Sequence, residues 1–390
     1  MRKLSDILSQ RIEKQVPSED APLMAFTAEG GVEPKGERYD RSYLVKSEDK
    51  LYKRTEYNDF IYSSNNLDVG SIGLNKYGTA VISDVYEIFS VKSDCLPTFV
   101  SELIQRPQNL AKILKYRQGC LYGQYRIYAE DFLSVSVFVP AKQEQNEIAQ
   151  FLDSIDKRIA HQRSLIEALK KYKRGLSDEL FGEKESGERW MTVPFSEAFD
   201  LLQNNTFSRD EMSTENGIAY NIHYGDVLIK YGAVVDLSKS KVPYIRSDVS
   251  LSKFAQSSYL RNGDIVIADT AEDYTVGKAV EIVGVADTKA ISGLHTIPCR
   301  PKISFAPMYL GYFINSKRFR TQILPLVQGT KVSSISKSEI LKTSIAFPSF
   351  GVQSQIAAVL YALDHRIDIC QACVHGLVRT KEALLQQLFI

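Results

Sequence analysis

The chain has 390 residues, 44% of them hydrophobic and 24% charged, with a formal net charge of +1. This length predicts two or three domains, and the near-neutral charge excludes binding of nucleic acid through overall charge, so any such binding must come from local basic patches. No apolar run approaches the roughly 18 residues that span a bilayer, the N-terminus lacks a signal-peptide core, and five scattered cysteines predict free thiols in the cytoplasm.

Residues 1–139 form a first block whose pattern predicts a mixed α/β domain. Runs rich in aromatic and β-branched residues at 59–62, 79–82 and 86–91 predict strands, and glycines punctuate this part of the chain. The segment 98–116 carries apolar residues in a broken pattern of threes and fours, which predicts helix.

A long helix is predicted for residues 140–182. Its apolar residues alternate at steps of four and three over about five heptads, which is typical of a coiled-coil seam. Pro140 stands just ahead of this helix, where a missing N–H costs nothing. The seam consists of Ile148, Leu152, Ile155, Ile159, Ile166, Leu169, Leu176 and Leu180.

A charged linker, residues 183–189, leads to a second block at 190–347 that repeats features of the first. The segment from Pro307 resembles the segment from Pro97, and Gln328-Gly329 matches Gln118-Gly119. The intervening loops, 68–77 and 269–287, differ in length and sequence. Because loops carry specificity on a common scaffold, the pattern predicts two related domains that recognise different targets.

Residues 348–390 repeat the first long helix. The two copies align without a gap, and about thirteen of about forty positions are identical. We expect the matching seams to pack on each other; two independent surface helices are the alternative. Polar or small breaks occur at matching places, Gln162 with Cys370 and Lys173 with Lys381, and such breaks fix register. The second seam consists of Ile356, Leu360, Leu363, Ile367, Val374, Leu377, Leu384 and Leu388.

Basic and amide residues interleaved with tyrosines predict DNA contacts in both blocks, because Arg and Lys reach guanine edges and phosphates while Gln and Asn pair with adenine. The loops after Gln118-Gly119 and Gln328-Gly329 are the preferred readers, since they lie at equivalent points and differ completely. For any single residue, a solvated surface charge is the simpler interpretation. The candidates are Lys46, Lys50, Lys53, Arg54, Arg117, Gln118, Tyr122, Gln124, Arg126, Lys230, Lys239, Lys241, Arg246, Lys331, Ser333, Ser334 and Lys337.

Together these features resemble the specificity subunit of a type I restriction-modification system. The resemblance covers the whole chain, and Trp190 fits the start of a second recognition domain. Met1–Leu4 begin inside the element that Trp190 opens, which predicts a shortened edge for the first domain. The resemblance is carried by Leu-Phe at 180–181 and 388–389 and by two matched motifs: Pro140, Gln145, Ile148, Ala149, Leu152, Asp156 and Ile159, with Pro348, Gln353, Ile356, Ala357, Leu360, Asp364 and Ile367.

The resemblance implies two α/β target recognition domains, 1–139 and 190–347, on an antiparallel coiled coil formed by helices 140–182 and 348–390. Each domain would read one half of a split double-stranded DNA site. The subunit would be non-catalytic and would itself hold no cofactor or metal; it would dock two adenine methyltransferase subunits and motor-nuclease subunits, which bring S-adenosylmethionine, ATP and Mg. About 35 helical residues give roughly 50 Å, more than one ~34 Å turn of duplex, so we expect a fixed unread gap.

No catalytic motif competes with this interpretation. The chain has no Pro-Pro dipeptide after Asn or Asp, no Gly-rich phosphate loop and no His-Glu-x-x-His. Reading Asp264, Asp269 and Asp287 as a nuclease centre, or Cys370 and Cys373 as a zinc site, is weaker than reading them as turn acids and small buried thiols on a helix. The alternatives are a single-chain restriction or modification enzyme and a coiled-coil scaffold that binds only proteins.

Overall fold

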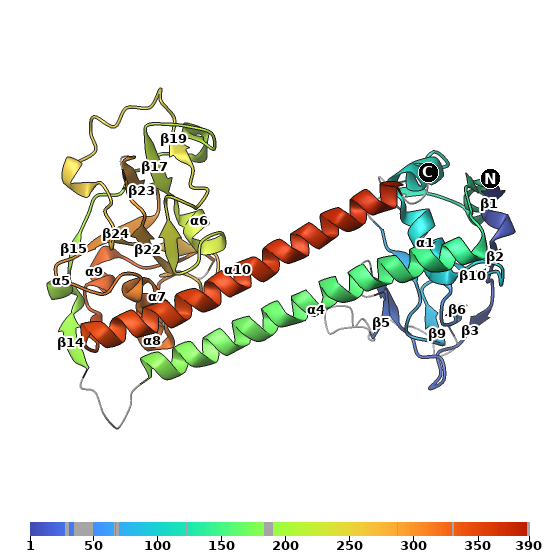
Figure 1. The fold of residues 1–390 in the computed structure, drawn as a ribbon, viewed down its shortest axis with the longest axis horizontal. Helices are drawn as coiled ribbons and strands as arrows, with labels where there is room; N and C mark the ends of the chain where they lie inside the picture. Colours follow the sequence, from blue (N-terminus) through green and yellow to red (C-terminus); the bar gives the residue numbers. More distant parts are fainter. Residues whose placement is uncertain are drawn as a thin grey trace. The chain divides into compact units, whose positions relative to one another are not determined.

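The chain divides into two compact units, one of residues 1–162 and 373–390 and the other of residues 163–372. The computed structural model describes residues 1–27, 31–34, 50–65, 67, 70–121, 124–182, 190–286, 288–329 and 331–387. Each unit contains one globular domain and a part of each of the two long helices, α4 (Lys142–Phe181) and α10 (Phe350–Gln387), which Figure 1 shows in green and red. The linker 183–189 lies outside the described residues.

The globular domain of unit 1 consists of short strands and short helices. One sheet has the order β2-β10-β7-β8, a second has the order β3-β6-β9, and the described residues also form the pairs β1-β13, β4-β5 and β11-β12. The strands are β1 (Arg2–Lys3), β2 (Leu8–Gln10), β3 (Lys14–Gln15), β4 (Ala25–Thr27), β5 (Gly31–Glu33), β6 (Tyr52–Thr55), β7 (Phe60–Ser63), β8 (Ile72–Leu74), β9 (Ala80–Ile82), β10 (Tyr86–Val91), β11 (Gln118–Leu121), β12 (Gln124–Arg126) and β13 (Ser136–Val137). The helices are η1 (Leu4–Asp6), α1 (Pro97–Gln105), α2 (Pro107–Leu114) and α3 (Ala129–Ser134).

The core of this domain is aromatic. Phe60, Tyr62, Phe89 and Phe132 are fully buried, and the rings of Tyr62 and Phe132 lie 4.6 Å apart. The predicted strands at 59–62, 79–82 and 86–91 are confirmed as β7, β9 and β10. The predicted helix at 98–116 is divided into α1 and α2 at Arg106, because the proline that follows has no N–H and disfavours a helical conformation before it.

The globular domain of unit 2 has two larger sheets. Their orders are β15-β24-β20-β22-β18 and β16-β19-β17-β23, with β17 and β23 parallel. The strands are β14 (Met191–Pro194), β15 (Phe199–Leu201), β16 (Met212–Ser213), β17 (Ala219–Ile222), β18 (Val234–Asp236), β19 (Tyr244–Ile245), β20 (Ile265–Ala268), β21 (Thr270–Ala271), β22 (Ala279–Val283), β23 (Ala290–Ser292), β24 (Thr296–Pro301), β25 (Ser333–Ser334) and β26 (Ser344–Phe347). The helices are α5 (Phe195–Ala198), η4 (Arg209–Glu211), α6 (Tyr224–Ile229), η5 (Gln256–Ser258), α7 (Tyr309–Asn315), α8 (Lys317–Ile323), η6 (Leu324–Leu326) and α9 (Lys337–Ile340).

The two domains share a frame, as the sequence predicts. In the second domain β14 pairs with β26 over four residues, and in the first β1 pairs with β13 over two, so the first strand is present in a shortened form. The chain then turns inward at Leu4 and at Phe195, both fully buried, whose amides donate to the carbonyls of Val135 and Thr343. The predicted class, two repeated mixed α/β domains joined by long helices, is confirmed.

Both long helices carry an inward-facing stripe. Among the predicted seam residues, Ile148, Leu152, Ile155, Ile159, Ile166, Ile356, Leu360 and Ile367 are buried, and Leu169, Leu176, Leu180, Leu363, Val374, Leu377 and Leu384 are half-buried. Leu388 lies outside the described residues. Within each unit the parts of α4 and α10 run antiparallel, because Asp156 of α4 meets Lys381 of α10 in unit 1, and Lys173 of α4 meets Asp364 of α10 in unit 2.

A glutamine near the start of each long helix attaches it to its domain. The Gln145 side chain donates to the carbonyl of Pro140 over 3.0 Å and accepts from the amide of Leu96 over 3.1 Å. Gln353 makes the same pair of hydrogen bonds, to the carbonyl of Pro348 over 2.9 Å and from the amide of Ala306 over 2.9 Å. Both glutamines are buried, so their amides take the place of water for backbone groups beside the helix.

Candidate nucleic-acid interface

A short hairpin forms an exposed edge of the first domain. Gln118 pairs with Arg126 and Leu121 with Gln124 across the hairpin, and Asn65 forms an isolated bridge to Arg126. Gly119 has a φ of +69°, which a residue without a side chain adopts readily. The hairpin and the chain at Asn65 therefore lie side by side; we call this the first edge.

The second domain has an equivalent edge. Gln328 bridges Ser334, and β25 pairs with β21, so that Thr270 lies beside Ser334 as Asn65 lies beside Arg126. Gly329 has a φ of +105°, and a Cβ atom there would collide with the carbonyl of Val332. In the second domain the structure thus brings the hairpin together with the divergent loop 269–287, whereas in the first domain the hairpin meets Asn65, which precedes the loop 68–77. We call this one the second edge.

The first edge carries guanidinium groups that are stacked on aromatic rings. Arg117 lies over the Tyr125 ring at 5.6 Å, and Arg126 lies over the Tyr128 ring at 4.9 Å. Both arginines and both tyrosines are exposed, so this edge presents positive charge with flat apolar faces. That combination suits phosphates and base edges.

Several residues at or near the first edge also interact with acids of the same domain. The buried carboxylate of Glu87 lies 3.7 Å from Arg126 and 2.9 Å from the amine of Lys53, and the Gln118 amide donates to Asp131 over 2.5 Å. Lys53 is therefore close to Arg126 but is largely buried in an internal ion pair. The predicted candidates Lys46 and Tyr122 lie outside the described residues, as does the side chain of Gln124.

The second edge is less basic and more apolar. Lys331, Val332 and Ser334 are exposed, and Tyr274, in the loop after β21, has 87% of its surface exposed. The guanidinium of Arg320 holds this loop by donating to the carbonyls of Tyr274 and Val276. An aromatic ring fixed on a supported loop and presented to solvent suits contact with a groove or a stacked base.

His295 lies beside the second edge and was not among the predicted residues. Its imidazole is 3.5 Å from both Asp269 and the Thr270 hydroxyl, and it packs edge-on against the Tyr224 ring at 5.3 Å. No sequence signal marks His295, because its neighbours come from segments that the fold brings together. Tyr274 was equally unmarked, since a single tyrosine in a loop has no pattern.

Other predicted DNA contacts lie on different elements and have partners within the chain. Lys50 lies over the Tyr52 ring, Arg54 pairs with Glu56 and Gln15, Lys239 pairs with Asp236, Arg246 pairs with Asp248, and Lys337 reaches Asn204 over 3.5 Å. Lys241 is exposed, and Ser333 lies on β25 at the second edge. The structure therefore groups only part of the predicted set at the two edges.

Lys230 belongs to a separate charged cluster at α6. The buried Asp226 accepts from Arg209 over 2.7 Å and lies 2.9 Å from the amine of Lys230. Burial raises the pKa of Asp226, but the two cations outweigh this effect and hold the pKa below its ordinary value. Burial and the nearby Arg209 also lower the pKa of His223 to about 4, so this imidazole is neutral at pH 7.

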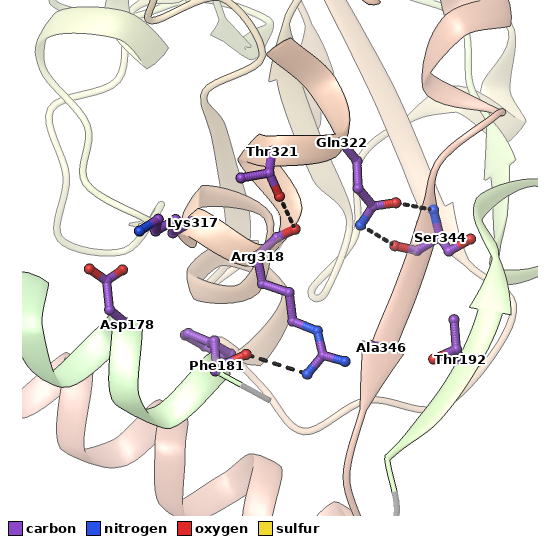
Figure 2. Close-up of a pocket in the computed structure, with 10 residues that line it drawn as sticks. Asp178, Phe181, Thr192, Lys317, Arg318, Thr321, Gln322, Ser344 and Ala346 are labelled. Atoms are coloured by element: carbon purple, nitrogen blue, oxygen red, sulfur yellow. Dashed lines mark hydrogen bonds between the residues drawn. The ribbon is translucent and has the colours of Figure 1, made fainter. Parts of the chain in front are cut away.

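A pocket of about 660 Å³ lies between the end of α4, α8 and the β14-β26 pair (Figure 2). Arg318 donates to the carbonyl of Phe181 over 3.4 Å, and Gln322 and Ser344 exchange two hydrogen bonds of 3.1 and 2.9 Å. Among the described residues that line it, only Asp178 is an acid and none is a histidine or cysteine. The pocket therefore marks where α4 attaches to the second domain and has no nucleophile paired with a base.

Among the acids and thiols that suggested a nuclease or zinc site, Asp264 has a structural role and Asp287 lies outside the described residues. Asp264 accepts from Arg300 over 2.6 and 3.0 Å and from the amide of Arg261, which fixes a turn. Cys370 is buried, as predicted, but the prediction of a buried thiol is wrong for Cys373, which is exposed on the same helix. In the part of the chain that the structure describes, no group of three His, Cys, Asp or Glu residues is placed to hold a metal ion. None of the described helices is long and apolar enough to cross a membrane.

Residues 7–171 match the family model for the type I restriction modification DNA specificity domain. This stretch contains most of the first globular domain and most of α4. A curated relative, the type I restriction enzyme MjaVIII specificity subunit of Methanocaldococcus jannaschii, is 23% identical over 337 residues, which are 78% of this chain and 76% of the relative. The resemblance to type I specificity subunits is confirmed.

Two solved structures share the fold of this chain. The type I restriction-modification S subunit from M. genitalium aligns with a TM-score of 0.58 and 14% identity, covering 100% of this chain and 95% of that one. A structure described as the basis of complex assembly and conformational transition of the type I R-M system aligns with a TM-score of 0.57 and 14% identity, covering 99% and 96%. The curated relative and the first of these structures are both described as specificity (S) subunits.

Proposed function

We propose that this chain reads a split DNA site, one half with each globular domain, and docks methyltransferase and restriction subunits of a type I system. The observation that carries the proposal is the repeated edge: Gln118 with Arg126 and Asn65 in the first domain, and Gln328 with Ser334 and Thr270 in the second. Equivalent positions with different side chains are what two readers of different sequences require.

The chemistry of the two edges supports DNA as the ligand. The first edge presents Arg117 and Arg126 on aromatic rings, and the second presents Lys331 beside two serines and the exposed Tyr274. Arginine, lysine and serine contact phosphates and base edges, and tyrosine contacts sugar or bases. With a net charge of +1, the chain concentrates these groups locally.

The long helices support a spacing and docking role. Exposed apolar side chains such as Phe151, Tyr172, Val359 and Ile369 remain on both helices and leave apolar surface for partner subunits. In this proposal the two adenine methyltransferase subunits and the restriction subunits bring S-adenosylmethionine, ATP and Mg, the chain holds no cofactor of its own, and the complex acts in the cytoplasm.

A map of adenine methylation by long-read sequencing tests the proposal. Cells that express the chain with its neighbouring methyltransferase are compared with cells that lack the chain. We expect methylation at a split motif with a fixed gap that disappears without the chain. A map that does not depend on the chain would contradict the proposal and favour the coiled-coil scaffold; a motif methylated by the chain alone would favour a single-chain enzyme.

A further inference from the structure

A lysine in each long helix joins three elements of its unit. In unit 1, Lys381 of α10 donates to Asp156 of α4 over 2.9 Å and to Glu102 of α1 over 3.1 Å. In unit 2, Lys173 of α4 donates to Asp364 of α10 over 2.5 Å and lies over the ring of Tyr312 of α7 at 5.3 Å. Each lysine thus contacts both long helices and the short helix of the globular domain. We call these two groups the clamps.

The clamps are equivalent parts of the internal repeat. Lys173 aligns with Lys381 and Asp156 with Asp364 in the two helix copies, and Glu102 aligns with Tyr312 in the two domains. The third partner differs: Glu102 accepts directly from its lysine, whereas the Tyr312 hydroxyl donates to Asp364 over 2.8 Å.

The clamp groups are only partly exposed. The side chains of Lys381 and Glu102 are 20% and 24% exposed, and those of Lys173 and Asp364 are 24% and 28% exposed. Burial lowers the pKa of Lys381, but the two carboxylates outweigh it and leave the pKa above its ordinary value. Charged groups in such a place add little net stability, while their directional contacts select one arrangement over others.

A directional contact matters here because DNA is helical. Each base pair added to the gap moves a half-site by about 3.4 Å and turns it by about 35° around the duplex. A recognition domain therefore has to be held at one rotation on its helices for one gap to be read. Apolar seam contacts are non-directional and resist rotation weakly, whereas a lysine held between two helices and the domain resists it.

We propose that Lys173 and Lys381 are positioning residues that fix each recognition domain on the helix pair, and that together they set the gap length that the chain accepts. This inference rests on the proposed function. Lys381 comes from the end of α10, far in sequence from the first domain, whereas Lys173 comes from the end of α4, which leads into the second domain. In each unit the lysine ties its own long helix to the other long helix and to the globular domain.

The test is the distribution of gap lengths among methylated sites in cells that carry the full system. We expect Lys381→Met and Lys173→Met each to keep both half-site sequences but to raise methylation at sites with a gap one base pair shorter or longer by about tenfold, as loss of a charge-assisted contact predicts. Lys381→Arg and Lys173→Arg, which keep the ionic contact, should restore the single gap. Lys171→Met, at an exposed position of α4, is the matched control.

The outcomes separate this inference from the proposed function. Mixed gaps in both methionine variants, with restoration by arginine, support it. A uniform fall in methylation at the unchanged motif would show a merely structural role and overturn it, as would a single unchanged gap at full activity. A wild-type map without any split motif would instead overturn the proposed function, and this inference with it.

Discussion

A single buried acid, Glu281, positions helix α7 in the second domain. Its buried carboxylate accepts from the amide of Met308 over 2.6 Å and from the amide of Gly311 over 2.9 Å, at the N-terminus of α7. Burial raises the pKa of Glu281 to about 7, although the backbone donors act in the opposite direction. Helix α7, which contains Tyr312 of the unit 2 clamp, is therefore held at its N-terminus by an acid with a pKa near 7.

The pKa of Glu281 predicts a pH-dependent stability. Because the folded pKa lies above the unfolded value of 4.5, the contribution of Glu281 to stability is complete below about pH 4.5 and falls as the pH rises through 7. Between pH 5 and pH 8 this loss is about 2–3 kcal/mol. We expect Glu281→Gln to remove this loss, at the cost of about 1 kcal/mol for one amide left without an acceptor.

Urea unfolding of wild-type and Glu281→Gln chains at both pH values measures this prediction. The difference in unfolding free energy between the two chains should change by the stated amount from pH 5 to pH 8. A difference that is the same at both pH values would show that Glu281 does not titrate in this range.

The sequence predicted least well which individual side chains lie exposed at the two edges. Arg117, Gln118 and Arg126 were predicted as DNA contacts and lie on the first edge, but Lys53 and Arg54 looked the same in sequence and are held in internal ion pairs. Whether a lysine meets a buried carboxylate such as Glu87 depends on a partner distant in the chain. His295 and Tyr274 had no pattern to mark them, for the same reason.

The long helices are the elements that the sequence predicted best. Their boundaries, α4 at Lys142–Phe181 and α10 at Phe350–Gln387, lie close to the predicted 140–182 and 348–390, because a seam of about five heptads and a proline ahead of it leave few alternatives. The short strands were harder to predict. β21 and β25 have two residues each, and their pairing has no periodicity that a sequence could display.

The two buried glutamines, Gln145 and Gln353, should contribute measurably to the stability of the chain. Gln145→Ala should leave the Leu96 amide and the Pro140 carbonyl without partners and cost about 2–4 kcal/mol of stability, and Gln353→Ala should cost a similar amount. Chemical unfolding of each variant measures the cost.

Exposed glutamines close by provide matched controls for this prediction. Gln143→Ala and Gln355→Ala change side chains on the same turns and should shift the unfolding free energy by less than about 0.5 kcal/mol. Equal effects of buried and exposed substitutions would show that the glutamines do not attach the helices to the domains.

The internal repeat organises the whole chain in the order domain, helix, domain, helix. Gln145 and Gln353, the two clamps and the two edges lie at equivalent points of this repeat. The sequence predicted this order because the repeat is visible in the residues themselves. That each compact unit takes a part of both long helices agrees with the expected antiparallel pairing, but the points of division, after Gln162 and after Ala372, depend on packing that the sequence does not display.

A methylation map of chains altered at one edge at a time shows whether the two domains read different halves of the site. Arg117→Ala with Arg126→Ala changes the first edge, and Lys331→Ala with Ser333→Ala changes the second. Loss of a base contact costs about 1–3 kcal/mol and relaxes the sequence only where that contact is made. We expect each double variant to relax one half-motif, a different half for each, with the gap unchanged. Variants that lower methylation without relaxing either half, or that relax the same half, would contradict two independent readers.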